Sequence, residues 1–497
     1  MTDDIPEKQR ALVFQGGGAL GAYEAGVFKG LYSKLFKPGE PLFDIVVGTS
    51  IGAINAAILV SHVKENKTWE DSEKILETFW TNVSSNPAFT RMWLDSWYSW
   101  NKFNSNAPSK EAARRYFATR EYLHYGAPGV FSPPTQIRDD KFLDSAYNTW
   151  YRYDNQPLKD SIKNLVNFPI STNYTDKEPR LLLTSVDVQE GMMVTFDSFQ
   201  YIGNECRICE EKIKDNENSN QQLNKKLVKH VYENHLEIPY SEGDVLRWSA
   251  YKTNQGKVIP IYYNDGLGLE HVIASASVPV YYDYAKIKSG KPPTKEDSGN
   301  ELDVHYFWDG GILSNTPLRE LIAGHRFYWE NKIGSETLEK DLWRIDESDA
   351  IKVPDLEVYV VNIWPTREKQ IPMDRDGTVD RKNDIIYHDK THYDEKVAHQ
   401  VTDYIGLIKH LIKLAKKKQA SKAELENVLK IITESTQNIE DKKEYAHLLQ
   451  GRFNVSVKRI ERVDDEHTIS NKWVDFTKDS IDELMLKGYE QCIDTIK

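Results

Sequence analysis

Short runs of β-branched and other apolar residues recur along the chain, and each run stops at a glycine or a polar residue. The clearest runs occupy positions 11–14, 43–47, 180–188 and 355–364. Near-continuous apolar runs of this length are typical of strands buried on both faces of a sheet. Each of the first two runs is followed by a helical pattern. The chain therefore begins as two strand–turn–helix units, which predict an α/β fold whose turns meet at one sheet edge.

A hairpin is predicted in the middle of the chain. Glu190 and Gly191 form a turn signal that separates the run at 180–188 from a second apolar run at 193–196. Two such runs joined by a short glycine-containing turn favour antiparallel pairing.

Beyond about residue 390 the pattern changes to long helices. Apolar residues at helical spacing form one stripe over 401–414 and a second over 425–432. We expect these helices to dock on the core or to dimerise, because the net negative charge disfavours an anionic membrane surface. Residues 453–459 are predicted to return to the core as a short strand.

Three tryptophans form a pattern of their own. Trp93, Trp97 and Trp100 are spaced at i, i+4 and i+7, which places them on one face of a helix. We interpret this face as part of the core. The alternative is an interfacial anchor or a lid beside an acyl pocket, because indole rings favour the boundary between water and lipid.

Composition narrows the class of protein. The chain has 497 residues, of which 39% are hydrophobic, so it can form one large α/β core with additions or about two to four domains. Its formal net charge of −12 argues against broad nucleic-acid binding. Residues 1–10 are polar, and no window approaches the ~18 consecutive apolar residues of a membrane span. Three cysteines provide no disulfide framework, so we expect a soluble cytoplasmic protein.

The sequence Gly48-Thr49-Ser50-Ile51-Gly52 is the candidate catalytic motif. It stands between a predicted strand and a small-residue helical run, the context in which Gly-x-Ser-x-Gly forms a nucleophile elbow. A serine on such a turn projects its hydroxyl away from the backbone, and Cβ atoms at Gly48 and Gly52 would crowd the neighbouring strand and helix. The alternative is an ordinary turn in which Ser50 caps a helix.

A glycine-rich loop follows the first predicted strand. Gln15-Gly16-Gly17-Gly18 precedes a helical pattern, but the lysine of a phosphate-binding P-loop is missing. The dinucleotide pattern Gly-x-Gly-x-x-Gly is formally present at Gly16, Gly18 and Gly21, although no second strand ends at an acidic residue at the expected distance. The other use of such a loop is an oxyanion hole, because successive glycine N–H groups at a helix N-terminus converge on one negative charge.

Three ordered blocks resemble the patatin-like phospholipases. The blocks are the glycine-rich stretch at 15–23, Gly-Thr-Ser-Ile-Gly-Ala at 48–53, and Phe-Trp-Asp-Gly-Gly at 307–311 with Asn-Thr-Pro at 315–317. The segment at 272–279 is similar to the family's Ala-Ser-x-Ala/Ser-x-Pro segment. The form of the first block resembles bacterial or archaeal members.

The resemblance implies a serine acyl hydrolase that uses a Ser–Asp dyad without histidine and needs no cofactor for catalysis. Carried over by position, Ser50 is the nucleophile, Asp309 is the base, and Gly16, Gly17 and Gly18 form the oxyanion hole. Asp309 stands where a predicted strand ends, and two glycines turn the backbone away from its carboxylate. A carboxylate with a pKa of about 4 is a weak base for a serine hydroxyl unless burial raises that pKa, so this dyad needs a desolvated site.

The resemblance also implies a lipid ester substrate, either a phospholipid or an acylglycerol. Transient contact with a membrane surface would then place the protein at the membrane periphery. An acyltransferase or thioesterase would use the same dyad with another acceptor. Further alternatives are a dinucleotide enzyme and a non-catalytic, zinc-dependent interaction protein. Nucleic acid is not expected as a partner, and the pattern leaves the oligomeric state open.

A second candidate site lies within residues 201–236. Cys206-x-x-Cys209 is followed twenty residues later by His230-x-x-x-x-His235, a ligand set that suits tetrahedral zinc. The spacing exceeds that of common zinc fingers, and a polar loop between the two pairs accounts for the excess. We predict a structural zinc site. The alternatives are a surface hairpin with two idle thiols and a redox pair.

Together these patterns predict one three-layer α/β core, resembling patatin and with a mostly parallel sheet, over residues 8–370. The small Cys/His insertion at 201–236 lies within this core. A helical C-terminal region follows at 371–497.

Overall fold

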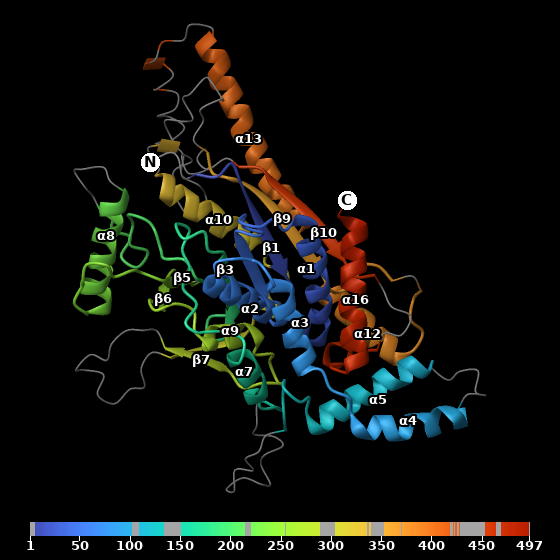
Figure 1. The fold of residues 1–497 in the computed structure, drawn as a ribbon. Coiled ribbons are helices and arrows are strands. Elements are labelled where there is room, and N and C mark those ends of the chain that lie inside the picture. Colours follow the sequence, from blue (N-terminus) through green and yellow to red (C-terminus); the bar gives the residue numbers. More distant parts are fainter. Residues whose placement is uncertain are drawn as a thin grey trace.

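The computed structural model describes residues 5–101, 109–133, 151–213, 220–253, 255–288, 304–334, 337–338, 352–368, 370–417, 421, 423–424, 427, 453–463 and 469–496. Within these residues a central sheet is covered by helices on both faces, and a small two-stranded sheet lies beside it (Figure 1).

The central sheet joins strands that are far apart in the sequence. They are β1 (Lys8–Phe14), β2 (Ile45–Thr49), β3 (Arg180–Asp187), β4 (Met192–Asp197), β7 (Ala285–Lys288), β8 (Val304–Asp309), β9 (Asp355–Asn362) and β10 (Val455–Glu461). Their order is β10-β9-β1-β2-β3-β8-β7, and β4 also pairs with β3. The strands from β10 to β3 are parallel, whereas β4, β8 and β7 pair antiparallel. The sheet is mostly parallel, as the apolar runs predict.

Alternate side chains of the strands enter two separate cores. On β1, Leu12 and Phe14 belong to one core, while Ala11 and Val13 belong to the other. The helices of the first core are α1 (Gly21–Leu35), α2 (Ile51–Asn66), α3 (Ser72–Val83) and α16 (Lys478–Thr495), and those of the second are α10 (Leu318–Ile333) and α13 (His392–Lys417). The predicted three-layer α/β fold is confirmed (Figure 1).

Shorter elements lie around these layers. They are α4 (Ala88–Asn101), α5 (Lys110–Tyr125), α7 (Gln156–Lys163), α9 (Leu269–Ala276) and α12 (Arg375–Tyr387), with the 3-10 turns η1 (Gly18–Leu20), η3 (Gly310–Ile312) and η4 (Lys472–Val474). Side-chain caps fix two of the helix starts: Ser109 accepts the N–H of Ala112 at 3.0 Å, and Asp374 accepts that of Gly377 at 2.9 Å. In the part of the chain that the structure describes, no helix has both the length and the apolar character to cross a bilayer.

The predicted hairpin is confirmed. β3 and β4 pair antiparallel, with Asp187 opposite Met192 at the turn. The apolar run of β3 is buried along its whole length. β2 and, further along, β8 pair with one of its edges, and β4 pairs with the other.

The segment after residue 370 completes the same core. The strand expected at 453–459 is confirmed as β10, which pairs in parallel with β9. The stripe at 401–414 lies on α13, which packs against α10 and β10. Apart from residue 427, the stripe expected at 425–432 lies outside the described residues.

Helix α16 packs along α1 at very short range. A Cβ atom at Gly26 of α1 would lie 1.9 Å from the carbonyl oxygen of Met485, and one at Gly488 of α16 would lie 2.2 Å from that of Tyr23. Glycine on both helices therefore lets the two backbones touch.

The tryptophan stripe lies on a helix, but the core interpretation of it is wrong. On α4, Trp93 is 42% exposed and Trp100 is 89% exposed, whereas Leu94 is buried. The rings of Trp93 and Trp97 pack edge-on against Phe117 of α5, with centroids 5.1 and 5.3 Å apart. Figure 1 shows α4 lying along α5, away from the sheet, so α4 has one narrow buried face.

The insertion has a small core of its own. It contains α8 (Asn220–Val231), a π-helical turn η2 (Tyr232–Leu236), and the strands β5 (Trp248–Lys252) and β6 (Val258–Tyr262), which pair antiparallel. Its buried side chains are Cys206, Leu227, Val228, Val231, Tyr232, Leu236, Leu246, Trp248 and Tyr262. This core therefore extends past residue 236 to β6. Of the segment 215–220 that was expected to form a loop, residue 220 begins α8 and the rest lies outside the described residues.

Candidate active site

Ser50 stands on a strained turn between β2 and α2. Its φ of 57° and ψ of −125° are a conformation that residues other than glycine rarely adopt. A Cβ atom at Gly48 would lie 2.2 Å from the carbonyl oxygen of Gly52, and one at Gly52 would lie 2.6 Å from that of Gln15. Both glycines therefore let the turn, α2 and the end of β1 approach one another. A strained serine between a strand and a helix is the geometry of a nucleophile elbow.

The side chain of Ser50 faces Asp309 and does not cap α2. No capping hydrogen bond joins the Ser50 side chain to the first turn of α2, which argues against the ordinary-turn interpretation. Instead, the Ser50 hydroxyl lies close enough to the Asp309 carboxylate to lower its pKa. The backbone N–H of Ser50 donates to Oγ of Ser275 in α9 at 3.0 Å, which fixes the turn from a second side.

Asp309 is held at the end of β8 by backbone contacts. Its N–H donates to the carbonyl oxygen of Ser277 at 2.9 Å, and the N–H of Gly311 donates to its Oδ1 at 2.7 Å. A Cβ atom at Gly310 would lie 2.5 Å from the carbonyl oxygen of Thr184 on β3, so the turn after Asp309 must begin with a glycine. The carboxylate is thereby fixed opposite Ser50.

Burial makes Asp309 a stronger base than an exposed aspartate. The residue is 6% exposed, and the loss of water raises its pKa to about 6. The Ser50 hydroxyl and the hydrogen bond from the Gly311 N–H act in the opposite direction and lower the pKa, but burial outweighs them. A pKa of about 6 leaves the group ionised at neutral pH while bringing it closer to that of an effective general base.

The glycine-rich loop lies directly against Ser50. A Cβ atom at Gly16 would be 2.8 Å from Cβ of Ser50. The N–H of Gly16 donates to Oδ1 of Asn315 at 3.1 Å, so it is not available to an oxyanion. Gly18 has a φ of 55°, a left-handed conformation that favours glycine. Of the three oxyanion-hole residues expected from the sequence, Gly17 and Gly18 therefore remain as candidate donors.

Asn315 ties the loop after Asp309 to the glycine-rich loop. Its Nδ2 donates to the carbonyl oxygens of Gly16 at 3.2 Å and Tyr387 at 2.7 Å, while its Oδ1 accepts the Gly16 N–H. Nε1 of Trp364 donates to the same Gly16 carbonyl oxygen at 2.7 Å. Both backbone polar groups of Gly16 are therefore engaged, which fixes the orientation of the peptide units that follow.

A buried polar network supports the loop from inside the fold. The N–H of Gln15 donates to Oε1 of Glu24 at 2.6 Å, and Nε2 of Gln15 donates to Oγ1 of Thr316 at 2.6 Å. Oε1 of Gln15 accepts the N–H of Ile363 at 2.9 Å, and Nδ2 of Asn55 donates to Oε2 of Glu24 at 2.9 Å. Glu24 is fully buried, and burial raises the pKa of its carboxyl group. The network links the first and third sequence blocks, and through Asn55 it reaches α2, which begins within the second block.

Sequence reasoning did not identify these supporting residues. Glu24 and Asn55 are polar residues within the apolar first turns of α1 and α2, each close behind a glycine motif. A polar residue at a position that must be buried was the available signal, because such a group needs a partner.

Apolar and aromatic side chains lie close to Asp309. Ile312 and Leu313 follow the Asp-Gly-Gly turn directly and are 47% and 53% exposed. The rings of Tyr282 and Tyr387 are near enough that the charge of Asp309 adds to the effect of burial, which raises the pKa of both phenols. Surroundings of this kind suit the acyl chain of a lipid.

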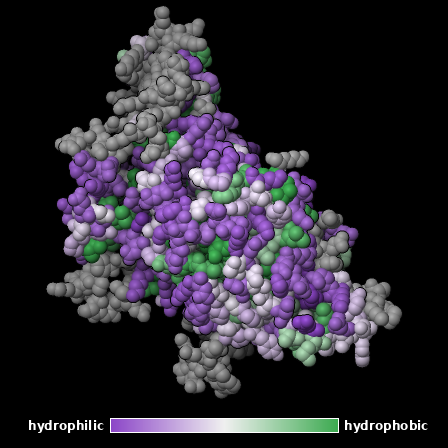
Figure 2. Space-filling model, viewed as in Figure 1, coloured by the Kyte–Doolittle hydropathy of each residue, from purple (hydrophilic) through white to green (hydrophobic). Residues whose placement is uncertain are grey.

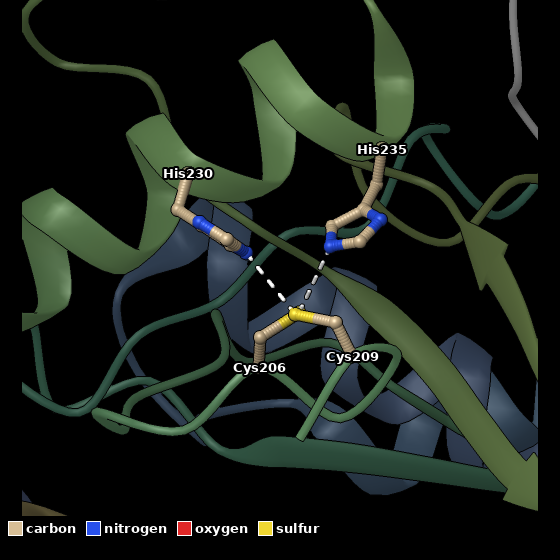
Figure 3. A group of neighbouring side chains, drawn as sticks. All are labelled: Cys206, Cys209, His230 and His235. Carbon is tan, nitrogen blue, oxygen red and sulfur yellow. Dashed lines mark hydrogen bonds between the residues drawn. The ribbon is translucent and has the colours of Figure 1, made fainter. Parts of the chain in front are cut away.

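The four predicted metal ligands also come together, but in the insertion (Figure 3). The ligand atoms of Cys206, Cys209, His230 and His235 all lie within 4.8 Å of one another. Sγ of Cys206 is 3.3 Å from Nε2 of His235, and Sγ of Cys209 is 3.3 Å from Nε2 of His230. Among the described residues this is the one cluster of at least three His, Cys, Asp or Glu side chains that could hold a metal ion. Its one buried member, Cys206, belongs to the insertion core, which is separate from the core around Ser50.

Comparison with known proteins identifies the family. No curated protein gives a significant sequence match to this chain. Among solved structures, the crystal structure of VipD from Legionella pneumophila matches at 11% sequence identity with a TM-score of 0.29, over 99% of this chain and 67% of that one. A likeness at this TM-score carries no argument about function. The family profile described as patatin-like phospholipase matches residues 12–322, which is more than half of the chain and includes both Ser50 and Asp309. The chain therefore belongs to the patatin-like phospholipases, a family of lipid acyl hydrolases that need no cofactor for catalysis.

Proposed function

We propose that this protein hydrolyses lipid acyl esters with Ser50 and Asp309 as a catalytic dyad. The observation that carries the proposal is the position of Ser50, on its strained turn, beside a buried carboxylate whose pKa is raised to about 6. A serine hydroxyl needs an adjacent base to become a nucleophile, and Asp309 is that base.

Acylation uses the dyad and the glycine-rich loop together. As Oγ of Ser50 attacks the ester carbonyl carbon, Asp309 takes the hydroxyl proton. Negative charge develops on the carbonyl oxygen, and the N–H groups of Gly17 and Gly18 stabilise it beside the start of α1. When this intermediate collapses, the ester C–O bond breaks, the departing alcohol receives the proton from Asp309, and the acyl group remains on Ser50.

Deacylation repeats the sequence with water. Asp309 accepts a proton from the attacking water, the same N–H groups hold the second oxyanion, and the proton returns to Oγ of Ser50 as the fatty acid leaves. The chemistry requires no metal. A zinc ion at Cys206, Cys209, His230 and His235 would be structural, because these side chains lie in the insertion and one of them, Cys206, is part of its core.

The substrate class is a lipid ester, either a phospholipid or an acylglycerol. Membership of the family supports this assignment, and so do the exposed apolar side chains of Ile312 and Leu313 beside the dyad. Transient contact of these side chains with a membrane surface would bring the ester bond to Ser50.

Labelling with a fluorophosphonate tests the dyad directly, because the probe reacts with an activated serine. We expect the wild type to be labelled, Ser50→Ala to be unlabelled and Asp309→Asn to be labelled far more slowly. Ser96→Ala, which removes an exposed serine on α4, is the control and should label as the wild type does. Equal labelling of wild type and Ser50→Ala would overturn the proposal.

Product analysis then defines the reaction. Hydrolysis of a phospholipid or acylglycerol by the wild type should release free fatty acid. Transfer of the acyl chain to an added alcohol or thiol, in preference to water, would instead identify an acyltransferase that uses the same dyad.

A further inference from the structure

We infer that Cys206, Cys209, His230 and His235 bind one zinc ion in a closed tetrahedral site that fastens the insertion to the hydrolase core. The site stands apart from the proposed hydrolysis. It rests on the geometry of the four side chains and on the contacts of the segment that carries them.

The distances between the ligand atoms fit a tetrahedral ion. Zn–S bonds of about 2.3 Å and Zn–N bonds of about 2.0–2.1 Å place neighbouring ligand atoms about 3.3–3.8 Å apart. The two cysteine–histidine pairs are each separated by 3.3 Å, and all four atoms lie within 4.8 Å. Two thiolates and two imidazoles favour zinc over calcium or magnesium, which prefer oxygen ligands.

A short hairpin presents the two cysteines. The N–H of Cys206 donates to the carbonyl oxygen of Glu211 at 2.9 Å, and Glu205 forms a bridge with Lys212. Glu210 has a φ of 58°, which turns the chain back directly after Cys209. Both sulfur atoms therefore lie within 4.8 Å of each other and of the two histidine nitrogens.

A π-helical turn brings the two histidines together. His230 lies in the last turn of α8, and His235 lies in η2, where the N–H of Glu237 donates to the carbonyl oxygen of Tyr232 five residues earlier. In a regular α-helix, five residues rotate by about 500°, which would leave the two side chains about 140° apart around the axis. The wider π turn reduces this angle, and both rings point toward the cysteines (Figure 3). A π turn placed between two ligands is typical of a functional site.

The outer ring nitrogen of His230 also has partners. Its Nδ1 lies 3.0 Å from the side-chain amide of Asn234 and 3.7 Å from Oε2 of Glu211. When Nε2 binds a metal, Nδ1 carries the proton, and the Glu211 carboxylate can accept it. Partners of this kind are what metal-bound histidines normally have.

The insertion core is small, so it needs a metal site to be stably folded. It buries nine side chains, and one of them is the ligand Cys206. Units of this size usually need a metal or a disulfide for stability. Both cysteines are free thiols in this structure, so they are available as ligands.

The site also fastens the insertion to the core. Arg207, between the two cysteines, places its guanidinium 4.1 Å from the ring centroid of Phe327 on α10. From β5, Ser249 Oγ donates to the carbonyl oxygen of Thr195 on β4, and the Tyr251 hydroxyl donates to Asp187 on β3. A metal that fixes the hairpin against α8 thereby holds Arg207 in position on α10.

Metal analysis of the intact chain tests the inference. We expect about one zinc per chain in the wild type, and a loss of most of it in Cys206→Ser and in His230→Ala. Cys492→Ala and His124→Ala are matched controls, because these residues lie on α16 and α5, and both should retain the zinc. Wild-type protein without zinc after reconstitution, or zinc retained in the Cys206→Ser variant, would overturn the proposal.

A second measurement covers the case in which the ligand variants fail to fold. Cobalt(II) added to zinc-depleted wild type should give the strong visible absorption of tetrahedral thiolate coordination. Cys206 and Cys209 should resist alkylation until a chelator is added. A weak octahedral spectrum, or alkylation at the same rate with and without chelator, would contradict a closed site with two thiolate ligands.

Discussion

The dyad and the Cys/His cluster differ in what holds them in place. Ser50 and Asp309 follow β2 and end β8, far apart in the sequence, and the central sheet brings them together. The four candidate metal ligands lie within residues 206–235, on one hairpin and one helix end, above a core of few side chains.

This difference separates two ways of preparing a site. Burying the Asp309 carboxylate lowers the stability of the fold, because its raised pKa means that the folded state disfavours its charge. The packing of the large core offsets this loss. In the insertion the site would instead add to the stability of the fold, because the bound ion would itself stabilise it. Damage to one site should therefore leave the other intact.

The largest expected effect is the loss of hydrolysis in Ser50→Ala. Removing the nucleophile should lower the rate of lipid ester hydrolysis by at least about 1,000-fold. The zinc content and the midpoint of thermal unfolding should equal those of the wild type. The Ser96→Ala control should also match the wild type in both measurements. A variant that loses zinc together with activity would show that the two regions are not independent.

Gly48→Ala should destabilise the hydrolase core. Its Cβ would lie 2.2 Å from the carbonyl oxygen of Gly52, where only backbone movement can relieve the overlap, so we expect a loss of at least about 3 kcal/mol in the free energy of unfolding. Gly324→Ala on α10 is the matched control, because the nearest atom to its Cβ would be 3.6 Å away. Denaturant unfolding compares them, and equal stabilities would contradict the close packing of the elbow.

Asp309→Asn should lower the rate of hydrolysis and raise the free energy of unfolding. We expect hydrolysis to fall at least about 100-fold, because the base is lost. The folded-state pKa of Asp309 is raised to about 6, above its value in the unfolded chain, so the stability that it contributes is complete at low pH and is lost as pH rises through 6. At pH 8 the neutral asparagine should therefore raise the free energy of unfolding, by up to about 3 kcal/mol.

The pH profile gives the control for this variant. In the wild type, kcat/KM should fall about tenfold per pH unit below pH 6, as the base becomes protonated. The residual activity of Asp309→Asn should lack this inflection. An unchanged profile would assign the titration to another group.

Removal of zinc should have the smallest effect on catalysis. Chelation is expected to lower the protection of residues 206–236 in hydrogen exchange, while the rate of fluorophosphonate labelling at Ser50 changes less than about threefold. A large loss of labelling would mean that zinc removal alters the geometry of Ser50 and Asp309 through the contact of Arg207 with α10. The two regions would then not be independent.

Sequence patterns predicted the elements that local chemistry determines. The strands β1, β2, β3 and β9, the β3–β4 hairpin and the turn around Ser50 follow from apolar runs and glycine positions, which act over a few residues. The short strands β5, β6 and β7 were not predicted. The proximity of the glycine-rich loop and Ser50 could be expected as well, because the parallel strands β1 and β2 place their carboxyl ends at one edge. That rule does not place Asp309, because β8 pairs antiparallel with β3 and meets the end of β2 along the same edge of β3.

Features that depend on distant partners were not predictable in this way. The stripe that includes Trp93 and Trp100 has the spacing of a buried helix face, but its burial depends on what packs against α4, and that is α5 instead of the sheet. Likewise, the N–H of Gly16 looks free in the sequence, while Asn315 occupies it from the opposite half of the chain. The π turn between His230 and His235 has no composition signal of its own.

Because α16 packs against α1, part of the first core can form only after the C-terminal segment has been synthesised. A ribosome makes Ser50 and Asp309 well before it makes α16 and the turn at Trp473, whose carbonyl oxygen would lie 2.3 Å from a Cβ at Gly18. Until that segment emerges, one face of α1 has no cover and the glycine-rich loop lacks one of its walls. The nascent chain therefore contains Ser50 and Asp309 before the segment that packs against the glycine-rich loop has been made.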